Sequence, residues 1–121
     1  MGIETIFANI SCSDLEVSLL WYQKLFGVPP TRRPMDGLAE WHFTDSAEVQ
    51  LYENKPNAGR TTLTIGVLPL EPERQRLSEQ GLEPGPIETT KDFFLMRIKD
   101  PDGNLVVMVS AQRSSDDWSR P

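Results

Sequence analysis

The sequence predicts an α+β fold in which two βαβββ modules form a curved eight-stranded sheet around a cavity, with the helices outside. Three observations lead to this prediction. A strand pattern followed by a helix pattern occurs twice, the two copies keep one register, and an Asp-Pro-Asp-Gly-Asn turn closes the second copy. We expect a single domain over 1–121, with module one at about 3–54, a linker at about 55–60, module two at about 61–111 and a frayed tail at 112–121.

The first strand and helix are the clearest elements of module one. Residues 5–12 alternate between an apolar and a largely polar face, which is typical of a strand with one buried side. The segment Ser13-Asp14-Leu15-Glu16 matches a capping box with Ser13 as the cap, so a helix is predicted to begin here. Gly27 and the prolines after it predict where the helix ends. Residues at spacings of three and four form its inward stripe: Leu15, Leu19, Tyr22 and Phe26.

The rest of module one and the linker follow from alternation and turn residues. A basic, proline-containing loop is expected at 31–37, and strands are expected at 38–44 and 48–53. The segment 54–60 contains Pro56, Asn57 and Gly59, which indicates the connection between the modules.

Module two repeats this order. A strand is predicted at 61–67, then a helix with Leu70 and Leu77 facing inward that ends at Gly81, then strands at 93–99 and 105–109 around the turn. An offset of 55 residues relates Leu15 to Leu70 and places Thr62 at the position of Phe7. Self-similarity of this kind predicts a duplicated module.

The charge, the lengths of the apolar runs and the cysteine count exclude several classes of function. The formal charge of -6 makes nucleic acid and anionic membranes poor partners, because both need a basic face. No apolar run is long enough to span a membrane, and no export segment is seen at the start, so we expect a cytoplasmic protein. Cys12 is the single cysteine, which excludes an intrachain disulfide and, with one histidine, a Cys/His zinc cluster. We expect Cys12 to pack in the core.

Taken together, these features resemble the vicinal oxygen chelate superfamily, which includes glyoxalase I, extradiol dioxygenases, and fosfomycin and bleomycin resistance proteins. The resemblance covers 6–109. It is carried by the strand leading into Ser13-Asp14-Leu15-Glu16, by the helix end from Trp21-Tyr22 to Leu25-Phe26-Gly27, and by the turn Asp100-Pro101-Asp102-Gly103-Asn104.

The resemblance also assigns positions for a metal site. In metal-dependent members the first and last strands of each module supply ligands, and these places are held here by Phe7, Gln50, Thr62 and Val107. A phenyl ring and an isopropyl group cannot donate to a metal ion, so we expect no metal cofactor. The chain is closest in character to metal-free members resembling bleomycin resistance proteins. For them the resemblance implies a homodimer that sequesters a drug in a groove between subunits.

Strand parity and the resemblance together define a ligand-binding face. One of the neighbours Trp41 and His42 is expected to face the cavity. The other candidates are Phe7, Asn9, Gln50, Tyr52, Thr62, Thr64 and Val107. An apolar floor with amides and hydroxyls suits a small organic molecule, cationic or aromatic, such as an antibiotic.

Two alternatives to this binding function remain open. One is an enzyme of the superfamily, of lyase, isomerase or dioxygenase type, with His42 as its general base or with metal ligands at other positions. The other is a non-catalytic dimeric interaction module.

Overall fold

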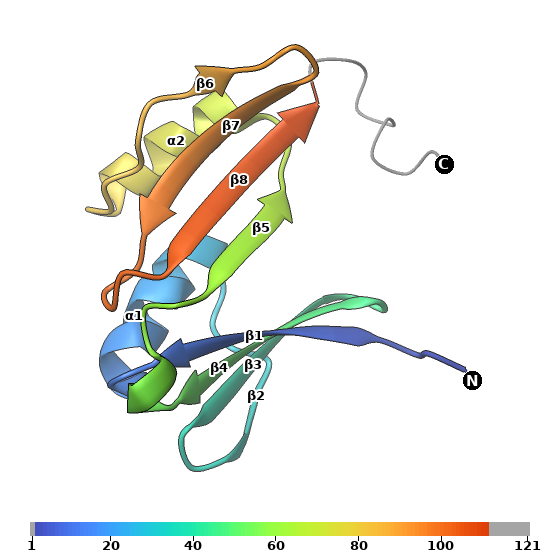
Figure 1. The fold of residues 1–121 in the computed structure, drawn as a ribbon, viewed down its shortest axis with the longest axis vertical. Coiled ribbons are helices and arrows are strands. Elements are labelled where there is room, and N and C mark those ends of the chain that lie inside the picture. The colour runs from blue at the N-terminus through green and yellow to red at the C-terminus, as the bar shows by residue number, and fades with distance from the viewer. Residues whose placement is uncertain (1, 112–121) are drawn as a thin grey trace.

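The computed structural model describes residues 2–111 and contains two βαβββ modules (Figure 1). Module one consists of β1 (Ile6–Cys12), α1 (Leu15–Phe26), β2 (Arg32–Met35), β3 (Leu38–Thr44) and β4 (Ala47–Glu53). A short 3-10 turn, η1 (Lys55–Asn57), leads to module two, which consists of β5 (Thr62–Gly66), α2 (Leu70–Glu79), β6 (Glu88–Thr89), β7 (Phe93–Lys99) and β8 (Leu105–Ala111). The expected tail at 112–121 lies outside the described residues.

The eight strands form two four-stranded sheets with one plan. Sheet A has the order β1-β4-β3-β2 and sheet B the order β5-β8-β7-β6. In each sheet the first and last strands of the module pair in parallel, and the remaining pairs are antiparallel. The predicted α+β class and the duplication are therefore confirmed. The eight strands are divided between two sheets, and β1 and β5 are edge strands.

Three local predictions were wrong or incomplete. The expected loop at 31–37 contains β2. All four residues of β2 are exposed, so the strand has no alternation of buried and exposed side chains that the sequence could show. β6 has only two residues, too few for a pattern. Asp14, and not Ser13, caps α1, because the Asp14 carboxylate accepts hydrogen bonds from the backbone N–H groups of Glu16 and Val17.

The buried faces of both sheets and both helices share one hydrophobic core. Leu15 and Leu70, the pair related by the 55-residue offset, are each the first residue of a helix and are each 4% exposed. Cys12 is buried in this core, as expected. Because the inner faces of both sheets are used in this core, the opposite faces of both sheets are open. No helix in 2–111 is long and apolar enough to cross a membrane.

The turn between β7 and β8 joins the modules through Asp100. The Tyr22 hydroxyl on α1 donates to Asp100 Oδ2 at 2.7 Å, and Asn104 Nδ2 donates to the same oxygen at 2.8 Å. Asn104 Nδ2 also donates to the carbonyl oxygen of Ser11 on β1 at 2.9 Å. Burial and the hydrogen bond to Asp100 both raise the pKa of Tyr22, so its hydroxyl remains a donor.

Two further contacts join the modules. The carboxylate of Asp102 accepts hydrogen bonds from the backbone N–H and the hydroxyl of Ser13. From α2, the Arg76 guanidinium donates to the carbonyl oxygens of Lys24 and Leu25 at 2.8 and 2.5 Å. These carbonyls lie in the last turn of α1, where they have no partner within the helix.

We predict that Tyr22→Phe lowers the free energy of unfolding by about 1–3 kcal/mol, because it leaves the buried Asp100 carboxylate without one of its donors. Urea unfolding measures this change. Tyr52→Phe is the matched control, since the Tyr52 side chain is 37% exposed and its loss of a hydroxyl should change stability by less than about 0.5 kcal/mol. Equal effects of the two substitutions would contradict the role assigned to Asp100.

Candidate functional site

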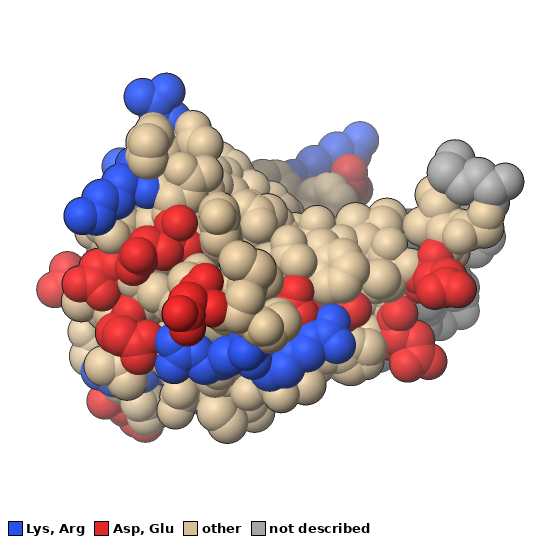
Figure 2. All heavy atoms as spheres, turned by 90° about the horizontal axis from the view of Figure 1, so that it is seen from below, with Lys and Arg blue, Asp and Glu red and all other residues tan. Residues whose placement is uncertain are grey.

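The open face of sheet A carries most of the residues predicted to bind a ligand. Cross-strand partners project from the same side of a sheet, and the register pairs Asn9 and Glu40 with Gln50, and Phe7 and His42 with Glu48. Tyr52 lies two residues beyond Gln50 and shares the face. Figure 2 views the molecule from below, the side on which sheet A lies in Figure 1. Acidic and basic side chains gather on part of this surface, beside wide areas of uncharged atoms.

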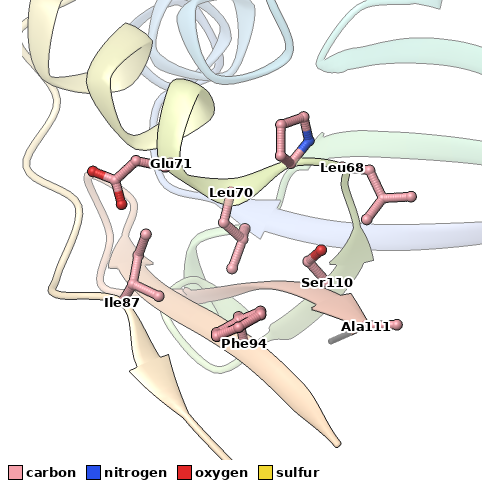
Figure 3. A pocket seen from close by; sticks show the side chains of 8 residues that line it. Leu68, Leu70, Glu71, Ile87, Phe94, Ser110 and Ala111 are labelled. Carbon is pink, nitrogen blue, oxygen red and sulfur yellow. The ribbon is translucent and has the colours of Figure 1, made fainter. Parts of the chain in front are cut away.

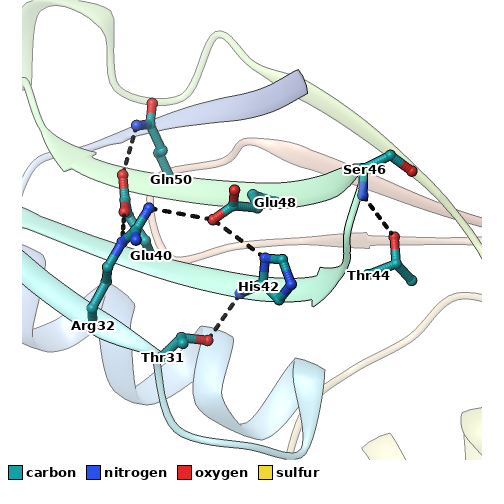
Figure 4. A network of polar contacts seen from close by, with 8 residues as sticks. All are labelled: Thr31, Arg32, Glu40, His42, Thr44, Ser46, Glu48 and Gln50. Atoms are coloured by element: carbon teal, nitrogen blue, oxygen red, sulfur yellow. Dashed lines mark hydrogen bonds and ion pairs between the residues drawn. The ribbon is translucent and has the colours of Figure 1, made fainter. Parts of the chain in front are cut away.

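A chain of hydrogen bonds crosses the face from Arg32 to Asn9, and Figure 4 shows its part from Arg32 through Glu40 to Gln50. Arg32 Nε donates to Glu40 Oε1, Gln50 Nε2 donates to Glu40 Oε2 at 2.7 Å, and Asn9 Nδ2 donates to Gln50 Oε1 at 3.2 Å. Glu40 is only 4% exposed. Burial acts to raise the pKa of Glu40, but the hydrogen bonds from Gln50 and Arg32 outweigh it, so this pKa lies below its ordinary value.

A second carboxylate, Glu48, lies beside this chain with weaker partners. Arg32 Nη2 and His42 Nδ1 lie 3.5 and 3.6 Å from Glu48 Oε1. The Glu48 side chain is 9% exposed and that of His42 is 43% exposed. Two carboxylates, those of Glu40 and Glu48, face the one guanidinium of Arg32, so these three groups carry a formal charge of -1.

Aromatic side chains flank these polar groups, and Trp41 is not one of them. Phe7 and Tyr52 are 38% and 37% exposed on the open face. Trp41 is 1% exposed, its Nε1 donates to the carbonyl oxygen of Val28 at 3.0 Å, and its ring packs against Phe26. The inclusion of Trp41 among the ligand-binding candidates is therefore corrected. Of the two neighbours, His42 lies on the open face and Trp41 lies in the core, because alternate residues of a strand point to opposite sides.

The remaining candidates lie on the open face of sheet B. Thr64 and Arg97 both pair with Val107, and Thr62 pairs with Leu105. Thr62 and Thr64 are exposed and Val107 is half-buried. The structure thus divides the predicted site into one group on sheet A and a second group on sheet B, on faces that both turn away from the shared core.

Three residues of the sheet A cluster were missed by sequence reasoning. Glu40 and Glu48 each lie two residues before a residue that was chosen, so strict use of strand parity would have found them. Arg32 was assigned to a loop, and nothing in the sequence pairs it with Glu40.

The donor chemistry of the residues at the four inferred metal positions does not fit a metal ion. Phe7 and Val107 offer no donor atom, and the amide oxygen of Gln50 accepts from Asn9. Within 2–111, no three His, Cys, Asp or Glu side chains are grouped to hold a metal.

Cavities lie away from the sheet A face, and two of them are lined mainly by apolar residues. One, of about 590 Å³, opens beside the start of α2 (Figure 3) and is lined by Leu68, Pro69, Leu70, Glu71, Ile87, Phe94, Ser110 and Ala111. The other, of about 470 Å³, lies between the modules and is lined by Leu25, Phe26, Phe43, Thr44, Ala47, Thr64, Ile65, Gly66, Val67, Glu73 and Met108. Thr64 is the one predicted ligand-binding residue in the lining of either cavity.

Comparison with solved structures identifies the fold. The chain is similar to a glyoxalase/bleomycin resistance protein from Catenulispora acidiphila, with 27% identity, a TM-score of 0.82, and coverage of 89% of this chain and 98% of that one. It is also similar to TnmS3, an antibiotic binding protein from Streptomyces sp. CB03234, with 19% identity, a TM-score of 0.79, and coverage of 93% and 99%. The virulence protein STM3117 from Salmonella typhimurium gives 21% identity, a TM-score of 0.68, and coverage of 91% and 98%.

No family model and no curated protein matches the sequence. Two of the structural neighbours are described as glyoxalase/bleomycin resistance proteins, and the chain has their fold, that of the vicinal oxygen chelate superfamily, as the resemblance predicted.

The lowered pKa of Glu40 predicts how stability depends on pH. A carboxyl group whose pKa is lower in the folded state stabilises the fold above its unfolded pKa, about 4.3, and this contribution is lost as the pH falls through the folded pKa. Glu40→Gln removes the titrating group. The difference in unfolding free energy between the native chain and Glu40→Gln should therefore be largest near pH 7 and shrink below about pH 4. Urea unfolding at several pH values measures it, and a difference that grows in acid would contradict the assignment.

Proposed function

We propose that this chain is a metal-free small-molecule binding protein that holds an organic ligand on the open face of sheet A without transforming it. One observation carries the proposal. The exposed rings of Phe7 and Tyr52 and the amides of Asn9 and Gln50 share one sheet face, and hydrogen bonds already fix the amides. Apolar contact area with a few oriented polar groups is what an organic ligand needs.

The description of one structural neighbour supports the kind of ligand. TnmS3 is described as an antibiotic binding protein, and its structure matches 93% of this chain. By analogy we propose an antibiotic or a similar organic molecule with aromatic surface as the ligand, and sequestration as the role of this chain.

We also propose that the binding protein is a homodimer. Ligand-binding candidates lie on two open faces that one chain cannot turn toward each other, because both sheets use their opposite faces in one core. A second copy that places the open face of its sheet B against sheet A would bring Thr62, Thr64 and Val107 to the same ligand. Arg97 and Lys99 lie on that face of sheet B and would oppose the negative cluster on sheet A.

An acid–base enzyme is the second candidate. His42 lies on the open face with Nδ1 3.6 Å from Glu48, an arrangement in which a carboxylate can orient an imidazole base. In this case His42→Ala would abolish turnover of a substrate while leaving its binding largely intact.

We predict that an aromatic ligand found by screening binds more weakly, by about tenfold, to Phe7→Ala, because the variant loses a ring that contacts the ligand. Isothermal titration calorimetry measures the binding, and prior treatment with a chelator should leave it unchanged. Phe43→Ala is the matched control: this exposed phenylalanine lines the cavity between the modules instead. Weaker binding by Phe43→Ala alone would move the site to that cavity, and no binding by a broad panel of aromatic compounds would count against the proposal.

We predict that light scattering coupled to size-exclusion chromatography gives twice the mass of one chain. Val107→Asp should shift this equilibrium toward the monomer, because it places a carboxylate on the face of sheet B that would oppose the negative cluster on sheet A of the second copy. A strict monomer at about 100 µM would contradict the proposed dimer.

A further inference from the structure

The hydrogen-bond chain on sheet A contains one group that can only accept, the carboxylate of Glu40. An ionised carboxylate has no proton to donate. Glu40 is ionised near neutral pH, since its pKa lies below the ordinary value, and it is held on both sides by the donors Arg32 and Gln50. Its 4% exposure leaves little room for another partner. The carboxylate therefore dictates which end of the Gln50 amide faces it.

This constraint passes from one amide to the next. Because Gln50 must turn its NH2 group toward Glu40, its Oε1 faces Asn9. Asn9 must then present its own NH2 group to Gln50 Oε1, as the 3.2 Å contact shows. Asn9 Oδ1 is consequently turned away from the chain, and among the described residues no group donates to it.

Glu48 adds a second acceptor that lacks a short hydrogen bond. Its side chain is 9% exposed, yet the nitrogen atoms nearest to its Oε1, Arg32 Nη2 and His42 Nδ1, lie at 3.5 and 3.6 Å. A hydrogen-bond donor that approaches the Glu48 carboxylate more closely than these two groups would stabilise it. Phe7 pairs with Glu48 in the register and Asn9 pairs with the next residue on that face, so both acceptors lie beside the exposed ring of Phe7.

We infer that the open face of sheet A selects organic ligands that donate hydrogen bonds: a hydroxyl or amide N–H donates to Asn9 Oδ1, and an ammonium group, which has three donors, donates to Glu48 as well. This inference rests on the proposed binding function and names the ligand class for the same site. Glu40 acts as a positioning residue, because it fixes the amides without contacting the ligand. A ligand group that only accepts would leave Asn9 Oδ1 unpaired and would meet the negative charge of the cluster.

Matched naphthalene probes separate hydrogen-bond donation from shape. 2-Naphthylmethanol donates through its hydroxyl, its methyl ether has no donor, and 2-naphthylmethylamine is a cationic donor at neutral pH. Calorimetry on the native chain should rank the amine first, the alcohol second and the ether last. One well-placed hydrogen bond predicts a ratio of about tenfold between alcohol and ether.

Two variants test the origin of this ratio. Asn9→Ala removes the acceptor and should bring the alcohol-to-ether ratio close to one. Glu40→Gln lets the amide at position 50 turn either way, so the ratio should fall to about threefold or less although residue 40 does not touch the probe. Glu16→Gln is the matched control: it removes the same charge from the exposed side of α1 and should keep the full ratio.

The outcomes distinguish this inference from the proposed function. If alcohol and ether bind native protein equally and Phe7→Ala weakens both, the binding function stands and the inference is wrong. If the ratio survives in Asn9→Ala, the inference is also wrong, even where Glu40→Gln fails to fold. If none of the three probes binds, both proposals fail.

Discussion

The buried carboxylate of Asp100 is the interaction on which the arrangement of the two modules depends. It receives hydrogen bonds from Tyr22, 78 residues away, and from Asn104, whose amide also reaches β1. A buried carboxylate that loses a donor is costly, so these groups hold one another in place. The linker is shaped to fit this turn: a Cβ on Gly59, whose φ is +86°, would lie 2.5 Å from the carbonyl oxygen of Asp102. No other residue type avoids both the close approach and the strain.

The hydrogen bonds around Asp100 have a direct consequence for the face on which we propose that the ligand binds. Because the apolar faces of both modules lie in a common core, the open face of sheet A is left on the surface and is supported from behind by that core. Its side chains stand on hydrogen-bonded strands, which restricts their freedom before a ligand arrives. The pairing of Arg32 with Glu40 further orders the cluster, since a guanidinium and a carboxylate on neighbouring strands hold each other in one geometry. Such preorganisation lowers the entropy lost on binding.

The sequence predicts those elements whose side chains alternate between the core and the solvent. It does not predict an element whose side chains are all exposed. β1, β4 and β5 are visible as alternation, and the 55-residue offset relates α1 to α2 because both helices must start with a buried leucine. β2 is exposed along its whole length, so only its pairing with β3 defines it as a strand. The choice between Trp41 and His42 needs the position of α1, which covers one side of sheet A. The ion pair between Arg32 and Glu40 is a tertiary contact, and no local sequence pattern predicts it.

The polar chain on sheet A also bears on the chemistry that this scaffold supports. At a metal centre, the metal ion accepts electron pairs from the oxygen atoms of a substrate. Here the residue at an inferred metal position, Gln50, is tied by its NH2 group to Glu40, and its oxygen is tied to Asn9. Among the described residues no group donates to Asn9 Oδ1, and the donor nearest to Glu48 Oε1, Arg32 Nη2, lies at 3.5 Å. We therefore expect this face to favour a hydrogen-bond donor, whereas a metal site favours a ligand that offers lone pairs. This reversal follows from one buried carboxylate, because Glu40 sets the direction of every hydrogen bond after it.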